Sequence, residues 1–334
     1  MLERNIIANI HPVVNDYRGE NYWFNGCAAY VMESVAPRPG GDGKAPATDY
    51  DYSLFAGVTG DNFTQVWPKD GRFRGECASD YLYSAEYAAG VFGWIGYARE
   101  VVTDRREYAA KVVESIDRGV PVICLRGFDN LWSVVVGYED GGQTTLHMVH
   151  DRAEPERVSA GADIASMIFV GGKVREVPLA RVYREAIERL PGLLATQTDG
   201  YVFGAEAFRQ WADWLDSGGA GVMTDEGMWF THCSYVCILA TNGTCCHSFL
   251  NKAMELNPDM GFLKEVGALY RKTARMWGGE GKDNDADSLE ALGGGVYAKA
   301  EPLNDPVRRS RVAAKIRAFA VVIDEAARIL SDNL

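Results

Sequence analysis

The sequence has too few basic residues to balance its acidic ones. Of its 334 residues, 34 are lysine or arginine and 46 are aspartate or glutamate, which gives a formal net charge of −12 at pH 7. The mean electrostatic field of such a chain repels phosphate backbones and anionic lipid surfaces. We therefore expect neither nucleic acid nor a membrane as a partner.

No stretch of the sequence combines the length and apolarity of a membrane span, and the first residues lack the pattern of an export signal. No basic segment there leads into an apolar core and a small-residue cleavage site. Residues 227–251 carry no formal charge, but histidine, asparagine, serine and threonine interrupt them. Burying those side chains in lipid would be costly, so we expect a cytoplasmic protein in which this stretch belongs to a core.

The paired cysteine spacings of zinc sites are also missing. Seven cysteines form an odd set with no Cys-x-x-Cys pair, so reduced thiols are expected in a chain without an export signal. On a predicted helix, Cys233 and Cys237 are four residues apart among apolar neighbours, where thiols usually pack as small hydrophobic groups. We expect no metal ion at the six potential zinc ligands of this region, which are His232, Cys233, Cys237, Cys245, Cys246 and His247.

The best glycine-rich candidate for a phosphate-binding loop, residues 293–295, is also incomplete. It lacks the Lys-Ser/Thr that should follow the glycines and the strand that should precede them. We expect no nucleotide site and no cofactor.

The first half of the chain mixes helix and strand patterns. Apolar spacing predicts helices over residues 26–35 and 104–117. Runs rich in β-branched residues predict strands over 121–125, 131–138 and 144–149, the last two forming an antiparallel hairpin. A second hairpin is predicted from residues 167–170 and 173–177, which could fold around the Gly-Gly pair between them and extend the same sheet.

The second half contains almost only helical patterns. These cover residues 181–190, 205–215, 229–256, 260–277 and 307–330. A boundary near residues 176–180 follows. We therefore expect an α+β domain over residues 1–178 and a helical domain over residues 179–334 packed on it.

Cys27 is the first candidate for a catalytic residue. The predicted helix places it at or near the first turn, where the positive end of the helix dipole favours the thiolate form. The alternative interpretation is structural, because free cysteines are among the most buried residues and Ala28, Ala29 and Tyr30 are ordinary core material.

The order of elements favours the catalytic interpretation. A helix headed by cysteine is followed by a hairpin whose first strand ends Val-Val-Val-Gly-Tyr and whose second ends at Asp151. This order resembles the papain-like cysteine peptidases, and most closely the bacterial bacteriocin-leader-processing type and the butirosin biosynthesis protein H family. Members of that family join such a half to a helical C-terminal half, and the glycine- and aromatic-rich residues 51–60 and 90–96 are similar to their central segments. The resemblance implies a papain-like fold, an antiparallel sheet packed on the cysteine helix, and thiol-dependent acyl or amide chemistry.

The resemblance also implies a role for each matching position. A glutamine six residues before the nucleophile supplies an oxyanion donor in that clan, and here Asn21 occupies this position before Cys27. Asp151 matches the residue that orients the catalytic histidine. The histidine itself should open the first strand of the hairpin, but Leu131 stands there with Trp132 beside it, and neither can accept a proton.

A missing base has a large effect on rate. A free thiol with a pKa of ~8.5 is only a few per cent thiolate near neutrality, and a positioned base contributes roughly 10² to 10⁴ in rate. His150, His147 and His11 are the fallback bases, although a structural or surface role fits each of them as well.

Two functions remain open from the sequence. In the first, the protein is a cysteine-dependent acyltransferase or amide hydrolase acting on a peptide, acyl or small-molecule substrate, with Cys27 as nucleophile and Asn21 and Asp151 in support. In the second, it is a catalytically inactive papain-like protein that binds a small molecule or peptide without converting it.

Overall fold

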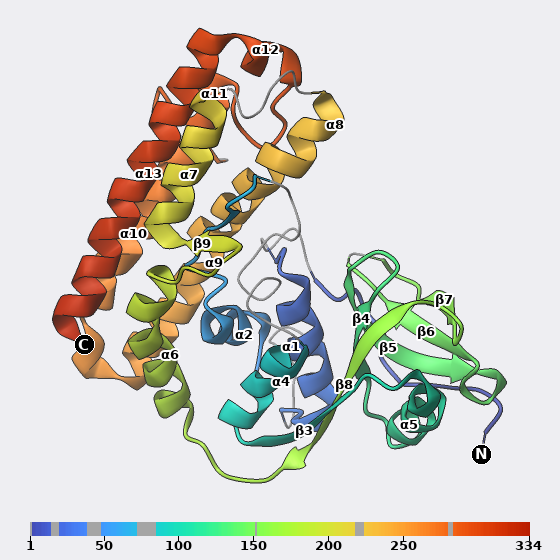
Figure 1. Cartoon of the computed structure of the whole chain (residues 1–334). Coiled ribbons are helices and arrows are strands. Elements are labelled where there is room, and N and C mark those ends of the chain that lie inside the picture. The colour runs from blue at the N-terminus through green and yellow to red at the C-terminus, as the bar shows by residue number, and fades with distance from the viewer. Residues whose placement is uncertain are drawn as a thin grey trace. The chain divides into compact units, whose positions relative to one another are not determined.

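The structure is a computed structural model. It describes residues 2–14, 20–38, 48–71, 85–150, 152–217, 224–279 and 283–334, without the side chains of residues 87, 228–230 and 243–245. The chain forms two compact units, and Figure 1 labels their elements. The first unit comprises Met1–Thr59 and Leu82–Val182, and the second comprises Gly60–Tyr81 and Tyr183–Leu334.

The first unit is α+β, as the sequence predicts, and is built on an antiparallel sheet. Within the described residues the sheet has seven strands in the order β3-β8-β4-β5-β6-β7, with β1 also paired to β5. The strands are β1 (Asn5–Ile6), β3 (Tyr97–Val102), β4 (Val122–Arg126), β5 (Trp132–Glu139), β6 (Thr144–Met148), β7 (Glu156–Ser159) and β8 (Ile164–Lys173). The strands predicted over residues 121–125, 131–138 and 144–149 are therefore confirmed as β4, β5 and β6.

The predicted hairpin around Gly171 and Gly172 is wrong, because both glycines lie inside the single strand β8. β8 pairs with β3 along one edge and with β4 along the other. A Cβ at Gly171 would lie 3.0 Å from the Cβ of Ala98, where the β3–β8 register shifts. The glycine thus permits a close approach at a bulge, and it does not form a turn.

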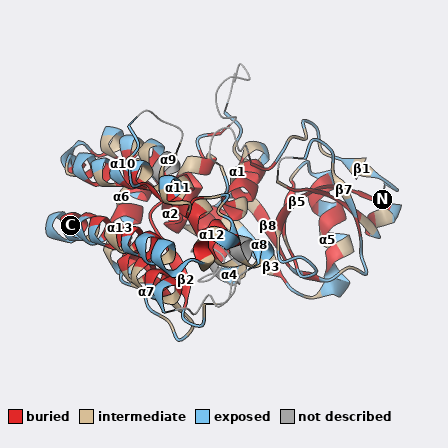
Figure 2. Cartoon of the chain, turned by 90° about the horizontal axis from the view of Figure 1, so that it is seen from above, coloured by how far each residue is buried: buried red, intermediate tan, exposed pale blue. Residues whose placement is uncertain are grey.

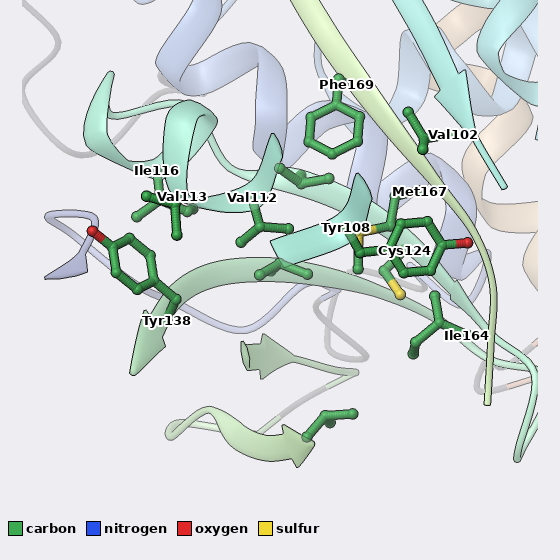
Figure 3. Packing of buried hydrophobic residues seen from close by; sticks show 13 residues of the cluster. Val102, Tyr108, Val112, Val113, Ile116, Cys124, Tyr138, Ile164, Met167 and Phe169 are labelled. Carbon is green, nitrogen blue, oxygen red and sulfur yellow. The ribbon is translucent and has the colours of Figure 1, made fainter. Parts of the chain in front are cut away.

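Two helices lie on opposite faces of this sheet. α5 (Arg105–Asp117) confirms the helix predicted over residues 104–117, and the Asp104 side chain caps it by accepting from Arg106 N. Its apolar side packs on the sheet with Val135 of β5, in the cluster shown in Figure 3. Because side chains alternate along a strand, Trp132 points to the other face, where its ring lies 5.0 Å from Phe24 of α1 (Trp23–Val35). β5 is therefore covered on both sides, and Figure 2 shows it as buried.

The remaining helices of the first unit are α2 (Tyr52–Thr59) and α4 (Ala85–Trp94), together with the first residues of α6 (Leu179–Leu194). The side chain of Thr59 at the end of α2 donates to Asn25 of α1 over 3.3 Å, and both residues are buried. This contact helps to fix α2 beside α1.

The second unit is mainly helical. Its elements after α6 are α7 (Gly204–Asp216), α8 (Asp225–Met228), a π-helical turn (Trp229–Cys233), α9 (Ser234–Leu256), α10 (Leu263–Trp277), α11 (Leu289–Leu292), α12 (Ala300–Asn304) and α13 (Pro306–Asn333). They confirm the helical patterns read from the sequence. Among the described residues, no helix is both long enough and apolar enough to span a bilayer.

A segment from the first half of the chain belongs to the second unit. β2 (Val66–Pro68) pairs with β9 (Tyr201–Phe203), more than a hundred residues away. Tyr270 of α10 donates its hydroxyl hydrogen to the carbonyl of Phe63 over 2.7 Å, and both residues are buried. The main division of the chain lies at Val182 and Tyr183, close to the expected boundary at 178, with residues 60–81 as an additional part of the second unit.

The Tyr270 hydrogen bond gives a test of this arrangement. Tyr270→Phe leaves the buried carbonyl of Phe63 without its donor, so we expect the free energy of unfolding of the second unit to fall by about 1–3 kcal/mol. Urea denaturation followed by circular dichroism measures the change. Tyr297→Phe is the matched control because Tyr297 is 82% exposed; equal stability of both variants would show that residues 60–71 are not anchored through this bond.

Candidate functional site

Cys27 does not lie at the first turn of its helix. α1 begins at Trp23, with Tyr22 as N-cap, so Cys27 is the fifth helical residue. In this added part of the helix, the Phe24 ring lies 5.0 Å from that of Trp132. The backbone N–H of Gly26 already donates to Tyr22 O over 3.1 Å. The N–H groups that have no acceptor within the helix, and the positive dipole end, therefore belong to residues before Cys27. Cys27 itself lies just after the first turn, near the expected position.

The Cys27 thiol is sealed and neutral. Its side chain is 0% exposed. Burial raises the pKa of the Cys27 thiol well above its ordinary value, and the electrostatic interaction with Cys124 adds to the effect. A buried thiol in apolar surroundings is inert, whereas reactive cysteines are partly exposed in electropositive surroundings. The position of Cys27 thus disfavours the thiolate that a nucleophile requires.

The position where a papain-like enzyme has its base is filled by packing residues. Leu131 accepts a hydrogen bond from Arg126 N over 2.9 Å through its carbonyl, which ties the start of β5 to β4. Trp132 is 4% exposed and lies against Phe24. An indole ring packed on α1 therefore stands where the imidazole is expected.

The other two expected catalytic residues, Asn21 and Asp151, are not observed in contact with Cys27. Asn21 is exposed, two residues before the start of α1, and so does not share the buried surroundings of the thiol. Asp151 lies outside the described residues.

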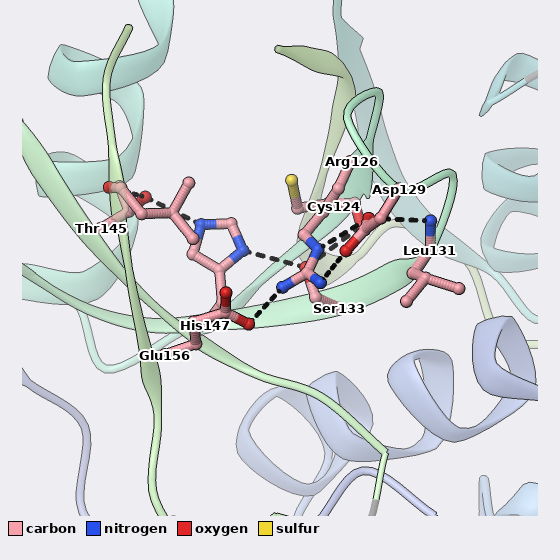
Figure 4. A network of polar contacts seen from close by, with 9 residues as sticks. Cys124, Arg126, Asp129, Leu131, Ser133, Thr145, His147 and Glu156 are labelled. Carbon is pink, nitrogen blue, oxygen red and sulfur yellow. Dashed lines mark hydrogen bonds and ion pairs between the residues drawn. The ribbon is translucent and has the colours of Figure 1, made fainter. Parts of the chain in front are cut away.

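His147 is on the wrong face of the sheet to act on Cys27. It is paired across the strands with Val135, whose side chain packs toward α5, so the imidazole points away from α1. Figure 4 shows its ring between Ser133 and Thr145, with Nδ1 2.9 Å from Ser133 Oγ and Nε2 2.8 Å from Thr145 Oγ1. Burial, assisted by the charge of Arg126, lowers the pKa of His147 to about 3.

The side chain of His11 contacts the C-terminal half of α1. Its ring stacks on Tyr30 at 4.2 Å, and its Nε2 lies 2.8 Å from Glu33 Oε2. Its Nδ1 lies 2.8 Å from the carbonyl of Pro12. Burial alone would lower the pKa of His11, but the hydrogen bond and charge of Glu33 outweigh it and the pKa is raised. Since both partners are oxygen acceptors, the protonated ring can donate at both nitrogens.

His150 is the fallback base that the structure brings to the side of α1 bearing Cys27. Its ring centroid lies 5.1 Å from that of Trp23, and Trp23 and Cys27 share one helix face at i and i+4. The backbone of His150 has a φ of 28°, in the left-handed region that non-glycine residues rarely adopt. Its carbonyl accepts from Val13 N over 2.9 Å.

A glycine beside Cys27 is the feature that sequence reasoning missed. A Cβ on Gly26 would lie 2.5 Å from Val14 Cγ1 and 2.7 Å from Val13 O. The chain before α1 therefore crosses the helix directly at this residue. The signal in the sequence was a glycine at the start of the predicted helix, because a residue without a Cβ lets another segment approach the backbone closely.

The potential zinc ligands of the second unit are used separately. His232 Nε2 lies 2.8 Å from Gly294 O, and His247 Nδ1 lies 3.3 Å from Arg271. Cys233 contacts the carbonyl of Ala298 at 3.8 Å. Across the part of the chain that the structure describes, no three His, Cys, Asp or Glu side chains are grouped to hold a metal ion; the side chain of Cys245 lies outside that part.

Comparisons with known protein families and with curated proteins find no match to this chain. The resemblance to papain-like proteins therefore depends on the residues and on the order of elements alone.

The buried His147 makes the stability of the protein sensitive to acid. Its pKa of about 3 in the folded state lies below the ordinary 6.5, so only the unfolded chain takes up a proton as the pH falls from about 6.5 toward 3. The stabilisation is present above pH ~6.5 and is lost at up to about 1.4 kcal/mol per pH unit below it.

His147→Gln removes this titration, so its free energy of unfolding should fall less steeply than that of the unchanged protein between pH 6.5 and 4.5. Urea denaturation at several pH values measures the difference. His232, whose pKa burial lowers to about 4, gives both proteins the same background. Parallel pH profiles would contradict the burial of an uncharged imidazole at position 147.

Proposed function

We propose that the first unit is a papain-like fold that binds a peptide or small molecule without converting it. The order of its elements supports the fold: a helix bearing a cysteine packs on an antiparallel sheet, and the strand that should supply the base faces it. The main observation against catalysis is that the Cys27 thiol is completely buried and its pKa is raised. The papain-like scaffold then serves recognition, within a cytoplasmic protein that has no nucleic acid partner.

The energetics support binding over catalysis. An ordinary thiol is already only a few per cent thiolate at neutral pH, and the raised pKa of Cys27 makes that fraction smaller still. A general base would normally recover roughly 10² to 10⁴ in rate, but Trp132 replaces it and His147 faces away. Cys27 therefore has neither a lowered thiol pKa nor a positioned general base to activate it.

Acyl or amide transfer by Cys27 is the second candidate. The observation that favours it is the position of His150, whose ring reaches Trp23 on the helix face that bears Cys27. In that reaction the thiol would lose its proton to the imidazole and attack an acyl carbonyl, with Asn21 as oxyanion donor and Asp151 as the next residue in the sequence after His150. The bond from the acyl carbon to the substrate's amine or thiol would then break, and the imidazolium would return the proton to that leaving group, which leaves the acyl group on Cys27 for transfer to water or to an acceptor. It requires Cys27 to become accessible.

Alkylation by iodoacetamide separates the two functions. The folded protein is treated at pH values from 6 to 9, and the modified cysteines are located by peptide mass spectrometry. We expect Cys27 to remain unmodified below pH 8, because its thiol is buried and protonated.

Urea-unfolded protein, in which every cysteine reacts, provides the reference rate, and Cys27→Ser identifies the Cys27 peptide. Alkylation of Cys27 below pH 8 at a rate above that of the other cysteines would overturn the binding function and favour the transferase.

A further inference from the structure

The chain between β1 and α1 forms a strap, residues 9–14, across the side of α1. The strap is held at its start because Ile7 N donates to Val136 O over 2.9 Å, continuing the pairing of β1 with β5. Asn9, with a φ of 57°, turns the chain away from the sheet. The strap then runs along α1 from Glu33 and Tyr30, in the C-terminal half of the helix, toward Gly26 near its start.

The first contact of the strap with α1 is polar. His11 N donates to the Tyr30 hydroxyl over 3.3 Å, and the imidazole stacks on the same ring. Its ion pair with Glu33 spans 2.8 Å. These contacts hold the strap at one point on the helix.

The second contact is apolar and close. Val13 and Val14 are 7% and 2% exposed, and they lie against the backbone of α1 where Gly26 has no side chain. Val13 N donates to His150 O. The valine pair is thus fixed between the start of α1 and the end of the hairpin formed by β5 and β6.

These contacts enclose Cys27. An α-helix turns by about 100° per residue. Relative to Cys27, Tyr30 lies about 60° and Gly26 about 100° around the axis in one direction, and Phe24 lies about 60° in the other. The strap covers the side of Tyr30 and Gly26, and Trp132 covers the side of Phe24. The thiol therefore lies between the strap and the sheet.

We propose that the side of α1 formed by Gly26, Tyr30 and Glu33 is a peptide-binding site, and that residues 9–14 of the same chain occupy it as a built-in ligand. The proposal rests on the proposed binding function and names its ligand class and its regulation. A partner peptide gains access by displacing the strap, and Cys27 is uncovered only while the site is empty.

The strap itself defines the partner. It lies outside any helix or strand, it offers the His11 imidazole to Glu33, and it places two small β-branched side chains on the bare backbone at Gly26. A competing ligand is accordingly an extended peptide with a basic residue two positions before a pair of valine-like residues. The site requires glycine at position 26, because any side chain there would collide with the ligand backbone at Val13 O.

Two variants release the strap in different ways. Gly26→Ala keeps a good helix former in α1 but brings a Cβ within 2.5 Å of Val14, so the site itself is blocked. Val13→Asp with Val14→Asp leaves the site intact but makes the strap a poor ligand. Gly90→Ala in α4 is the matched control, since a Cβ at Gly90 meets nothing within 4 Å. Circular dichroism verifies that each variant is folded.

The readout is the rate of Cys27 alkylation at pH 8.5. We expect both strap variants to react at least about tenfold faster than the unchanged protein, because they lose the burial of two valines, and Gly90→Ala to react at the unchanged rate. A capped synthetic peptide of residues 8–14 should restore protection to the double aspartate variant and fail to protect Gly26→Ala.

Slow alkylation in both folded strap variants would overturn the strap as the cover of Cys27 and leave the proposed binding function standing. Fast alkylation that the peptide does not reverse in the double aspartate variant would overturn the peptide site. Reaction of Cys27 below pH 8 in the unchanged protein would instead overturn the binding function, so the two failures are distinct.

Discussion

The packing of α1 on β5 is the contact on which the rest of the first unit depends. The ring of Phe24 on Trp132 fixes the helix against one face of the sheet, and α5 closes the other face around Val135. The thiol of Cys27, on this helix, is fully buried. Since burial of an unpaired thiol favours its neutral form, the same contact that stabilises the unit also sets the chemistry of its most reactive side chain.

The alternation of side chains along β5 and β6 divides the polar groups between two environments. His147 shares the α5 face with Ser133 and Thr145, where its two nitrogens are satisfied and its charge is excluded. His150 follows the end of β6, where the backbone turns through a left-handed conformation and the ring reaches α1. Three residues along one chain thus separate a structural histidine from one beside the candidate site.

Local patterns were reliable where local interactions decide the structure. The capped helix α5 and strands β4, β5 and β6 follow from periodicity and turn residues. These patterns failed at Gly171 and Gly172, because a Gly-Gly pair favours a turn only when no neighbouring strand competes, and here β3 pairs with β8 at Val170 and at Lys173, on either side of the two glycines. The start of α1 was misplaced because its N-cap residue, Tyr22, makes no side-chain capping hydrogen bond, so no capping residue marks the start of the helix in the sequence.

The sequence by itself determined the α+β composition of the first half, the helical second half, and the absence of a base at residue 131. These properties follow from residue type and from spacing within a few residues. Only the tertiary structure decided that Cys27 is sealed, that His147 faces away from it, and that residues 9–14 lie across Gly26. The burial of a side chain, the sheet face that it occupies and the segment that crosses a helix all depend on contacts between distant parts of the chain. The free energy of these contacts is a property of the whole folded chain and of no single segment.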